Sequence, residues 1–125
     1  MIPGRGPNHP TFRRSFLFAV QGFRTAVAQE RNIKVILATG AVTILVGLIV
    51  GLDAPSWAIL LLCCGCVIAA ELFNTAIEKV VDLVSPEFHP LAGQAKDIAA
   101  AAVWILCVLV AVVGILLFGR ALFFA

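Results

Sequence analysis

Apolar residues recur along the chain in four blocks, and each block has a pattern typical of a helix. The first block, residues 12–27, repeats its apolar side chains at helical spacing and places most of its basic and amide side chains elsewhere. A basic amphipathic helix of this kind lies in a membrane interface with its apolar face in the lipid. The apolar positions are Phe12, Phe16, Val20, Phe23 and Val27, and the polar ones are Arg13, Arg14, Gln21, Arg24 and Gln29.

Three longer apolar runs follow. The first is uncharged from Val35 to Leu52 and, counted from Ile33, provides about 20 residues, which is enough to cross a bilayer. The second continues past its apolar half with helical character until Pro86 stops it. The third is apolar from Ile98 to about Phe118. We expect membrane spans at about residues 33–52, 57–83 and 98–118, a loop at 89–93, and a third helix that opens near Lys96.

The composition places these helices in a membrane. The 125 residues are 62% hydrophobic and 13% charged, with a mean hydropathy of +1.06, whereas a soluble domain carries about a quarter charged residues. The sequence therefore predicts an all-α membrane protein. Residues 1–10 are rich in Gly and Pro and read as a flexible tail, and residues 11–125 as one domain. The formal charge of +2 is too small to suggest nucleic acid, and the four cysteines, in apolar runs, are expected to pack as free thiols.

Basic residues are distributed unevenly between the two sides. Lysine and arginine are concentrated before the first span and between the second and third, and are missing from the turn at residues 53–56. The positive-inside rule then places the N-terminus in the cytoplasm and the C-terminus outside a bacterial inner membrane. The residues counted are Arg5, Arg13, Arg14, Arg24, Arg31, Lys34, Lys79 and Lys96, with Arg120 on the opposite side.

A polar stripe interrupts the second span. Glu71, Asn74, Glu78 and Asp82 are spaced i, i+3, i+7 and i+11, which puts them on one face of a helix. A carboxylate within a span costs several kcal/mol unless it has a partner or water. Glu71 follows thirteen uncharged residues, so we expect it below the headgroup level, as a candidate general base.

The stripe also suggests a site for metal and phosphate. Glu78 lies closer to the cytoplasm, and Glu30 lies at a matching depth before the first span. Mg²⁺ prefers one or two carboxylates together with phosphate oxygens. Lys96, beside Asp97 at the expected start of the third helix, is suited to bind a phosphate, with amides of the helix N-terminus adding to it.

Other interpretations remain open at this point. The polar groups of the second span could hold helices together, and Asp82 is better explained as the solvated end of a helix than as a catalytic group. A small proton-coupled transporter subunit would use Glu71 as a proton relay, and a structural membrane subunit would need no chemistry. The clustering of ionisable groups on the cytoplasmic half favours surface chemistry over transport.

Three stretches resemble the prokaryotic diacylglycerol kinase/undecaprenol kinase family, and the resemblance covers about residues 12–120. The stretches are residues 71–82 (ELFNTAIEKVVD), 86–92 (PEFHPLA) and 95–103 (AKDIAAAAV). The resemblance implies a homotrimer with a composite active site. It also implies MgATP-dependent phosphorylation of a lipid hydroxyl at the cytoplasmic face.

The resemblance also implies roles for individual residues. Glu71 matches the catalytic base and contacts the lipid substrate, with Asn74 as its polar partner. Glu30 and Glu78 match the metal-binding carboxylates and so contribute to ATP binding. Arg24 falls among positions that line the lipid headgroup site. Nucleotide contacts are expected at Glu87, His89, Lys96 and Asp97, whereas Phe88 replaces the usual Tyr and removes its hydroxyl.

The branch of the family determines the expected substrate. The sequences at residues 30–32 (ERN), 85–92 (SPEFHPLA) and 96–100 (KDIAA) are more similar to the undecaprenol kinase branch. We therefore expect phosphorylation of undecaprenol to undecaprenyl phosphate. The alternative is a diacylglycerol kinase that produces phosphatidic acid.

Overall fold

The chain folds into four helices. The computed structural model describes residues 11–124, so the tail predicted at residues 1–10 lies outside the described residues. The helices are α1 (Phe12–Gln29), α2 (Arg31–Val50), α3 (Ala54–Val84) and α4 (Pro90–Phe123). The last three are long and apolar enough to cross a membrane. The prediction of an all-α protein with one amphipathic helix and three membrane-spanning helices is confirmed.

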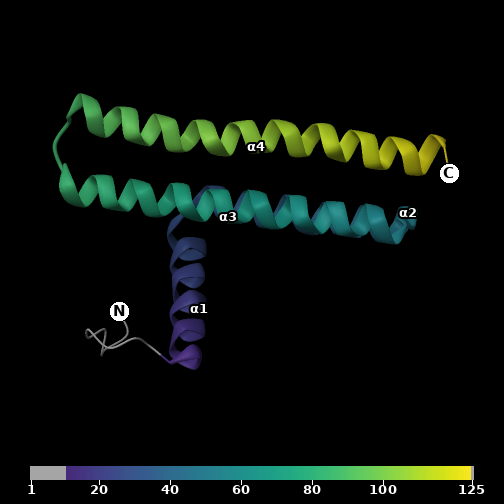
Figure 1. Ribbon diagram of the computed structural model, residues 1–125, viewed down its shortest axis with the longest axis horizontal. Coiled ribbons are helices and arrows are strands. Elements are labelled where there is room, and N and C mark those ends of the chain that lie inside the picture. Colours follow the sequence, from purple (N-terminus) through teal and green to yellow (C-terminus); the bar gives the residue numbers. More distant parts are fainter. Residues whose placement is uncertain (1–10, 125) are drawn as a thin grey trace.

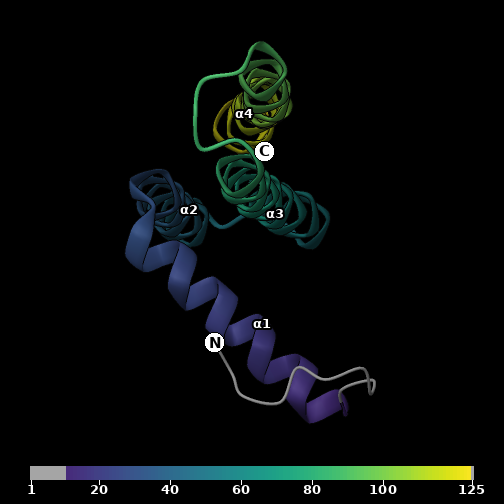
Figure 2. The same ribbon diagram turned by 90° about the vertical axis from the view of Figure 1, so that its left-hand side faces the viewer.

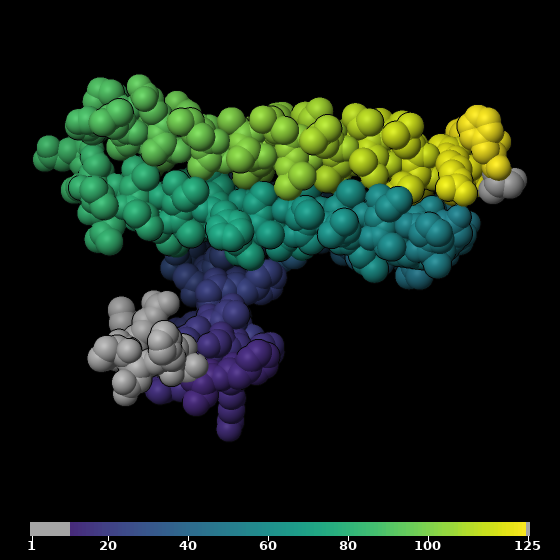
Figure 3. Space-filling model, in the orientation of Figure 1, coloured from purple at the N-terminus to yellow at the C-terminus, as the bar shows by residue number. Residues whose placement is uncertain are grey.

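The three long helices run side by side, and α1 crosses them at a steep angle (Figure 1). Viewed from the end, α3 lies between α2 and α4, while α1 leads away from the bundle (Figure 2). Helix α3 packs most extensively against α4 and next against α2. The space-filling view shows α3 and α4 in contact along their lengths, with α1 projecting below them (Figure 3). Helix α3 therefore brings the rest of the bundle together.

The lengths of the helices differ in a way that matters for the site. Helix α2 has 20 residues, about 30 Å, which matches the hydrocarbon core of a bilayer. Helix α3 has 31 residues, about 46 Å, and α4 is longer still. Both extend past the start of α2 toward the loop that joins them (Figure 1). The polar second half of α3 therefore lies level with α1 and the beginning of α2.

The turn at the other end of the bundle is held by three local features. Gly51 ends α2 with φ of 78°, a left-handed conformation that favours glycine. Asp53 caps α3, because its Oδ1 accepts a hydrogen bond from the Ser56 amide at 2.9 Å. Arg120, near the end of α4, lies 3.6 Å from the other Asp53 carboxylate oxygen. One aspartate thus joins the α2–α3 turn to the end of α4.

The prediction of a loop at residues 89–93 is wrong, because the chain is helical from Pro90 onward. Helix α4 begins at Pro90, where His89 acts as the cap and its Nδ1 accepts from the Leu91 amide at 3.1 Å. Proline is well suited to the first helical position, since it needs no hydrogen-bond partner there. The amides at the N-terminus of α4 therefore lie about two turns before Lys96 and not beside it.

Few side chains are buried inside the bundle. A buried cluster of Leu52, Leu60 and Leu117 packs the helices together at the end of the bundle that holds the α2–α3 turn. Gly47 lies directly against the Trp57 ring, so close that an added Cβ would stand 2.9 Å from a ring carbon. Most large apolar side chains are exposed on the outside of the bundle, as expected of a surface that faces lipid. The four cysteines are free thiols in the structure.

Candidate active site

The polar stripe of α3 is buried where it faces the rest of the bundle. Glu71 is 4% exposed, Asn74 8% and Thr75 4%, while Glu78 is half-buried. These side chains follow one another at helical spacing, so they line the same side of α3 over two turns. A buried carboxylate next to buried amide and hydroxyl groups is costly unless the groups serve one another or a ligand.

Glu71 lies against the start of α2. The Asn32 side chain is its hydrogen-bond partner, and the two charges that act on it most directly are those of Glu78 and Glu30. Three carboxylates from two parts of the chain therefore face the same region of the bundle. Glu30 comes from the α1–α2 junction, and Glu71 and Glu78 come from α3.

Asn74 is hydrogen-bonded to one carboxylate of α3, that of Glu78. Its Nδ2 donates to Glu78 Oε1 at 3.2 Å, one turn along the helix. Because a carboxylate only accepts hydrogen bonds, the amide nitrogen must face Glu78. Asn74 Oδ1 then remains buried without a partner, and so does the hydroxyl of Thr75. Two polar atoms are thus available for a ligand beside the carboxylates.

Glu30 is positioned by the corner between the first two helices. It ends α1, where its amide bonds to the Ala26 carbonyl at 2.9 Å, and its extended backbone then starts α2. The corner is tied to α3 by Lys79, whose Nζ donates to Gln29 Oε1 at 2.5 Å. Because Gln29 precedes Glu30, this bond holds the Glu30 carboxylate close to α3.

The carboxylates fit a metal that arrives with phosphate. Within residues 11–124, no group of three or more His, Cys, Asp or Glu side chains has the geometry of a complete metal site. Mg²⁺ is typically bound by one or two carboxylates plus phosphate oxygens and water. The assignment of Glu30 and Glu78 as the ligands of such an ion stays a prediction.

The other predicted nucleotide contacts lie around the α3–α4 loop. Lys96 Nζ lies 2.5 Å from Asp82 Oδ1, and the Lys96 side chain keeps 40% of its surface exposed. Asp82 thus ends the stripe as a solvated ion-pair partner on the surface. Glu87, His89 and Asp97 are exposed, and Ser85 Oγ donates to the Glu87 carbonyl at 2.9 Å. Arg24 is exposed on α1. These residues are reachable, and their roles stay predictions.

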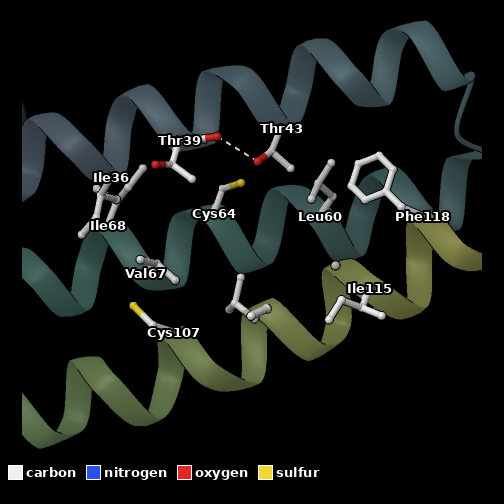
Figure 4. Close-up of a pocket in the computed structure, with 14 residues that line it drawn as sticks. Ile36, Thr39, Thr43, Leu60, Cys64, Val67, Ile68, Cys107, Ile115 and Phe118 are labelled. Carbon is white, nitrogen blue, oxygen red and sulfur yellow. Dashed lines mark hydrogen bonds between the residues drawn. The ribbon is translucent and has the colours of Figure 1, made fainter.

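An apolar cavity of about 630 Å³ opens between α2, α3 and α4. Its α3 wall ends with Val67 and Ile68, which precede Glu71 by four and three residues. Figure 4 shows Thr39, Thr43 and Cys64 directed toward its interior, with Leu60 and Phe118 at the end away from Ile68. A hydrocarbon chain is the kind of molecule that suits these walls. The cavity therefore lies one turn of helix beyond Glu71, on the membrane side.

Comparison with known proteins identifies the family. The family model described as prokaryotic diacylglycerol kinase matches residues 17–118. The chain belongs to this family of lipid kinases. It is 38% identical over 107 residues to the undecaprenol kinase of Bacillus subtilis, which covers 86% of the chain and 87% of the relative. It is thus a bacterial membrane enzyme, and the transporter and structural-subunit interpretations are set aside.

Other relatives of this lipid kinase are named diacylglycerol kinases. The diacylglycerol kinase of Helicobacter pylori is 31% identical over 101 residues, covering 81% of the chain and 79% of the relative. The diacylglycerol kinase of Escherichia coli is 47% identical over 47 residues, 38% of each chain. Membership in the family, inferred from the three sequence stretches, is confirmed.

Two polar residues beside the α3 stripe were not among the site residues predicted from the sequence. Asn32 partners Glu71 from α2, and Thr75 lies buried among the stripe residues. Asn32 carried one signal, since it is a polar residue at the very start of an apolar span, two positions after Glu30. Thr75 carried none, because a threonine in a membrane helix usually bonds its own backbone.

Proposed function

We propose that this lipid kinase transfers the terminal phosphoryl group of ATP to the hydroxyl of undecaprenol, at the cytoplasmic face of the membrane. The observation that carries the proposal is Glu71, buried against Asn32 with Glu30 and Glu78 nearby. It lies one turn from an apolar cavity. A base at the boundary between a lipid chain and phosphate-binding carboxylates is what transfer to a lipid alcohol requires.

The residues of the chain have distinct tasks in this proposal. Glu71 accepts the proton of the lipid hydroxyl as its oxygen attacks, and Asn32 orients the carboxylate through a hydrogen bond. Asn74 holds Glu78 in place through its amide nitrogen. The apolar cavity accepts part of the hydrocarbon chain and fixes the depth of the hydroxyl. Arg24, on the basic α1, contacts the polar end of the lipid.

Mg²⁺ enters the proposal with the nucleotide. Bound through Glu30 and Glu78, it would neutralise the negative charge that builds up on the phosphate oxygens. Glu87, His89, Lys96 and Asp97 bind the rest of the nucleotide in the region of the α3–α4 loop. Lys96 remains partly accessible while paired with Asp82, which supports a role as a phosphate contact.

Orientation, assembly and domain limits complete the proposal. The N-terminus faces the cytoplasm, because the basic residues gather on α1 and at the α3–α4 end of the bundle. Residues 11–125 act as one domain, with the membrane spans inside α2, α3 and α4. The family resemblance suggests a homotrimer as the working unit.

Undecaprenol is preferred over diacylglycerol because of the relative with this name. That relative is matched over 87% of its own length and 86% of the chain at 38% identity, whereas the diacylglycerol kinase of Synechocystis, 39% identical over 84% of the chain, is matched over 61% of its own length. Diacylglycerol is the second candidate, since several relatives carry its name. The apolar cavity is compatible with the chains of both lipids.

A competition assay tests the proposal. The purified protein in detergent receives labelled ATP, Mg²⁺ and equal amounts of undecaprenol and diacylglycerol, and the products are separated by thin-layer chromatography. We expect labelled undecaprenyl phosphate in clear excess over phosphatidic acid. A Glu71→Gln variant prepared in the same way controls for contaminating kinases. Phosphatidic acid as the main product would select the second candidate, and no labelled lipid would refute both.

A further inference from the structure

Thr75 differs from Thr39 and Thr43, the other threonines of the three long helices. The hydroxyls of Thr39 and Thr43 each donate to the carbonyl four residues earlier, at 2.8 Å. This is the usual arrangement of threonine in an apolar helix. The Thr75 hydroxyl makes no such bond, although the side chain is only 4% exposed. A buried hydroxyl without a partner destabilises the fold, so it needs an explanation.

The position of Thr75 on α3 connects it with the proposed reaction. It follows Glu71, the proposed base, by four residues, and it precedes Glu78, a proposed metal ligand, by three. At helical spacing both are its neighbours. The hydroxyl therefore lies between the group that would activate the lipid and the group that would hold the phosphates. In the proposed reaction, the phosphoryl group must pass from the side of Glu78 to the side of Glu71.

The chemistry of the neighbouring atoms restricts what Thr75 can bind. Glu30, Glu71 and Glu78 supply acceptors when ionised, and the free atom of Asn74 is also an acceptor, Oδ1. The Asn74 nitrogen is already used by Glu78. Thr75 thus brings a free O–H donor into a set of acceptors. Phosphoryl oxygens need donors, and a neutral one can approach them without repulsion.

We propose that the Thr75 hydroxyl donates a hydrogen bond to an oxygen of the phosphoryl group during transfer. The proposal rests on the function proposed above. In the step, the lipid oxygen forms a bond to the terminal phosphorus while the bond from that phosphorus to the bridging oxygen of ATP breaks. ADP leaves with the electron pair, and Glu71 receives the proton of the lipid hydroxyl. Thr75 keeps its own proton and is unchanged.

A Thr75→Val substitution removes the hydroxyl and keeps the shape of the side chain. We expect kcat to fall roughly 10- to 100-fold, the range of a hydrogen bond to a charged group. The KM for the lipid should change less than about twofold, because the bond is made to the phosphoryl group. The thermal midpoint should stay the same or rise, since an unpaired polar atom is replaced by a methyl group. Loss of activity with retained stability is a combination that a packing role would not produce.

Two further variants make the test specific. Thr75→Ser restores the hydroxyl with one methyl group fewer, and its kcat should lie within about threefold of the original protein. Thr25→Val makes the same chemical change at an exposed position of α1, and it controls for the general effect of losing a threonine hydroxyl. If Thr75→Val retains full kcat, the hydroxyl takes no part in the transfer and the proposal is wrong. Failure of the proposed function itself would appear separately, as no phosphorylated lipid from the unsubstituted protein.

Discussion

The Asn74 amide nitrogen donates a hydrogen bond to the Glu78 carboxylate at 3.2 Å, one turn along the same helix. This bond connects the buried part of the α3 stripe with its half-buried part. It also fixes which atom of each side chain remains available for a ligand. A residue expected only to accompany the base therefore orients a proposed metal ligand.

The proposed base is tested by Glu71→Gln. The substitution preserves volume and a hydrogen bond with Asn32, but it removes the group that accepts a proton. We expect the rate of lipid phosphorylation to fall at least about 100-fold, within the range of general-base catalysis. Nucleotide binding and thermal stability should be nearly unchanged. Activity within about tenfold of the unsubstituted protein would contradict the assignment.

The proposed metal ligands are tested by the Mg²⁺ dependence of the rate. Glu30→Ala and Glu78→Ala should each raise the Mg²⁺ concentration that gives half the maximal rate. If they hold one nucleotide-borne ion, the effects of the two substitutions should be coupled and not independent. Asp82→Ala is a matched control, because Asp82 is an exposed carboxylate on the same face of α3 as Glu78. Its partner is Lys96 of α4. An identical Mg²⁺ dependence in all proteins would exclude a metal role for Glu30 and Glu78.

Much of this site could be predicted from the sequence because helical spacing is a local property. The stripe from Glu71 to Glu78 follows from positions within one helix, and the family stretches strengthened it. Contacts between helices could not be obtained in the same way. The Asn32–Glu71 pair and the Lys79–Gln29 bond depend on how far α3 slides past α2 and α1. Spacing along one chain segment contains no information on that displacement.

The start of α4 shows a different limit of the sequence. Pro90 and Gly93 suggested a loop by composition, and yet the segment is helical from Pro90 onward. The decisive feature was the cap, because His89 accepts the Leu91 amide and proline fits the first helical position. A histidine cap is less common than Ser, Asp or Asn, so its signal was weak.

The close contact of Gly47 with Trp57 predicts a stability defect. In Gly47→Ala, the new Cβ would lie 2.9 Å from a Trp57 ring carbon and 3.1 Å from a Leu52 methyl group. Overpacking of this kind costs about 1–3 kcal/mol, more than the roughly 1 kcal/mol that alanine gains over glycine in a helix. We expect a lower thermal midpoint. Gly40→Ala, in the same helix with nothing within 4 Å of the new Cβ, should be neutral or stabilising.

The cap of α3 predicts a dependence of stability on pH. Hydrogen bonds from the Ser56 side chain and amide, with a smaller contribution from Arg120, hold the pKa of Asp53 below its ordinary range. A lowered folded-state pKa means that the ionised form stabilises the fold above the unfolded pKa of about 4, and this contribution is lost as the pH falls through the folded pKa. The thermal midpoint should therefore fall in acid. Asp53→Asn keeps a good cap without the charge, and the midpoint of this variant should fall less over the same range.

The last prediction concerns assembly. One protomer already buries Glu71, Asn74 and Thr75, so shielding of the stripe from lipid does not by itself require a second copy. A better physical argument comes from α4, where Ala101 and Ala102 are exposed on the outside of the bundle. Small residues on a membrane helix permit close approach of another helix, and this packing is lost when they face lipid. Together with the family resemblance, this leads us to expect an oligomer as the active species.

Sedimentation in density-matched detergent should then give a mass above that of one 13.3 kDa chain, and we expect three copies. Ala101→Leu would add bulk at the contact, so it should shift the protein toward smaller species and reduce phosphorylation in parallel. The same substitution at a position that faces only lipid would cost little, because leucine is as apolar as the lipid chains. A monomer with full activity would refute the prediction, since every group needed for transfer would then come from one chain.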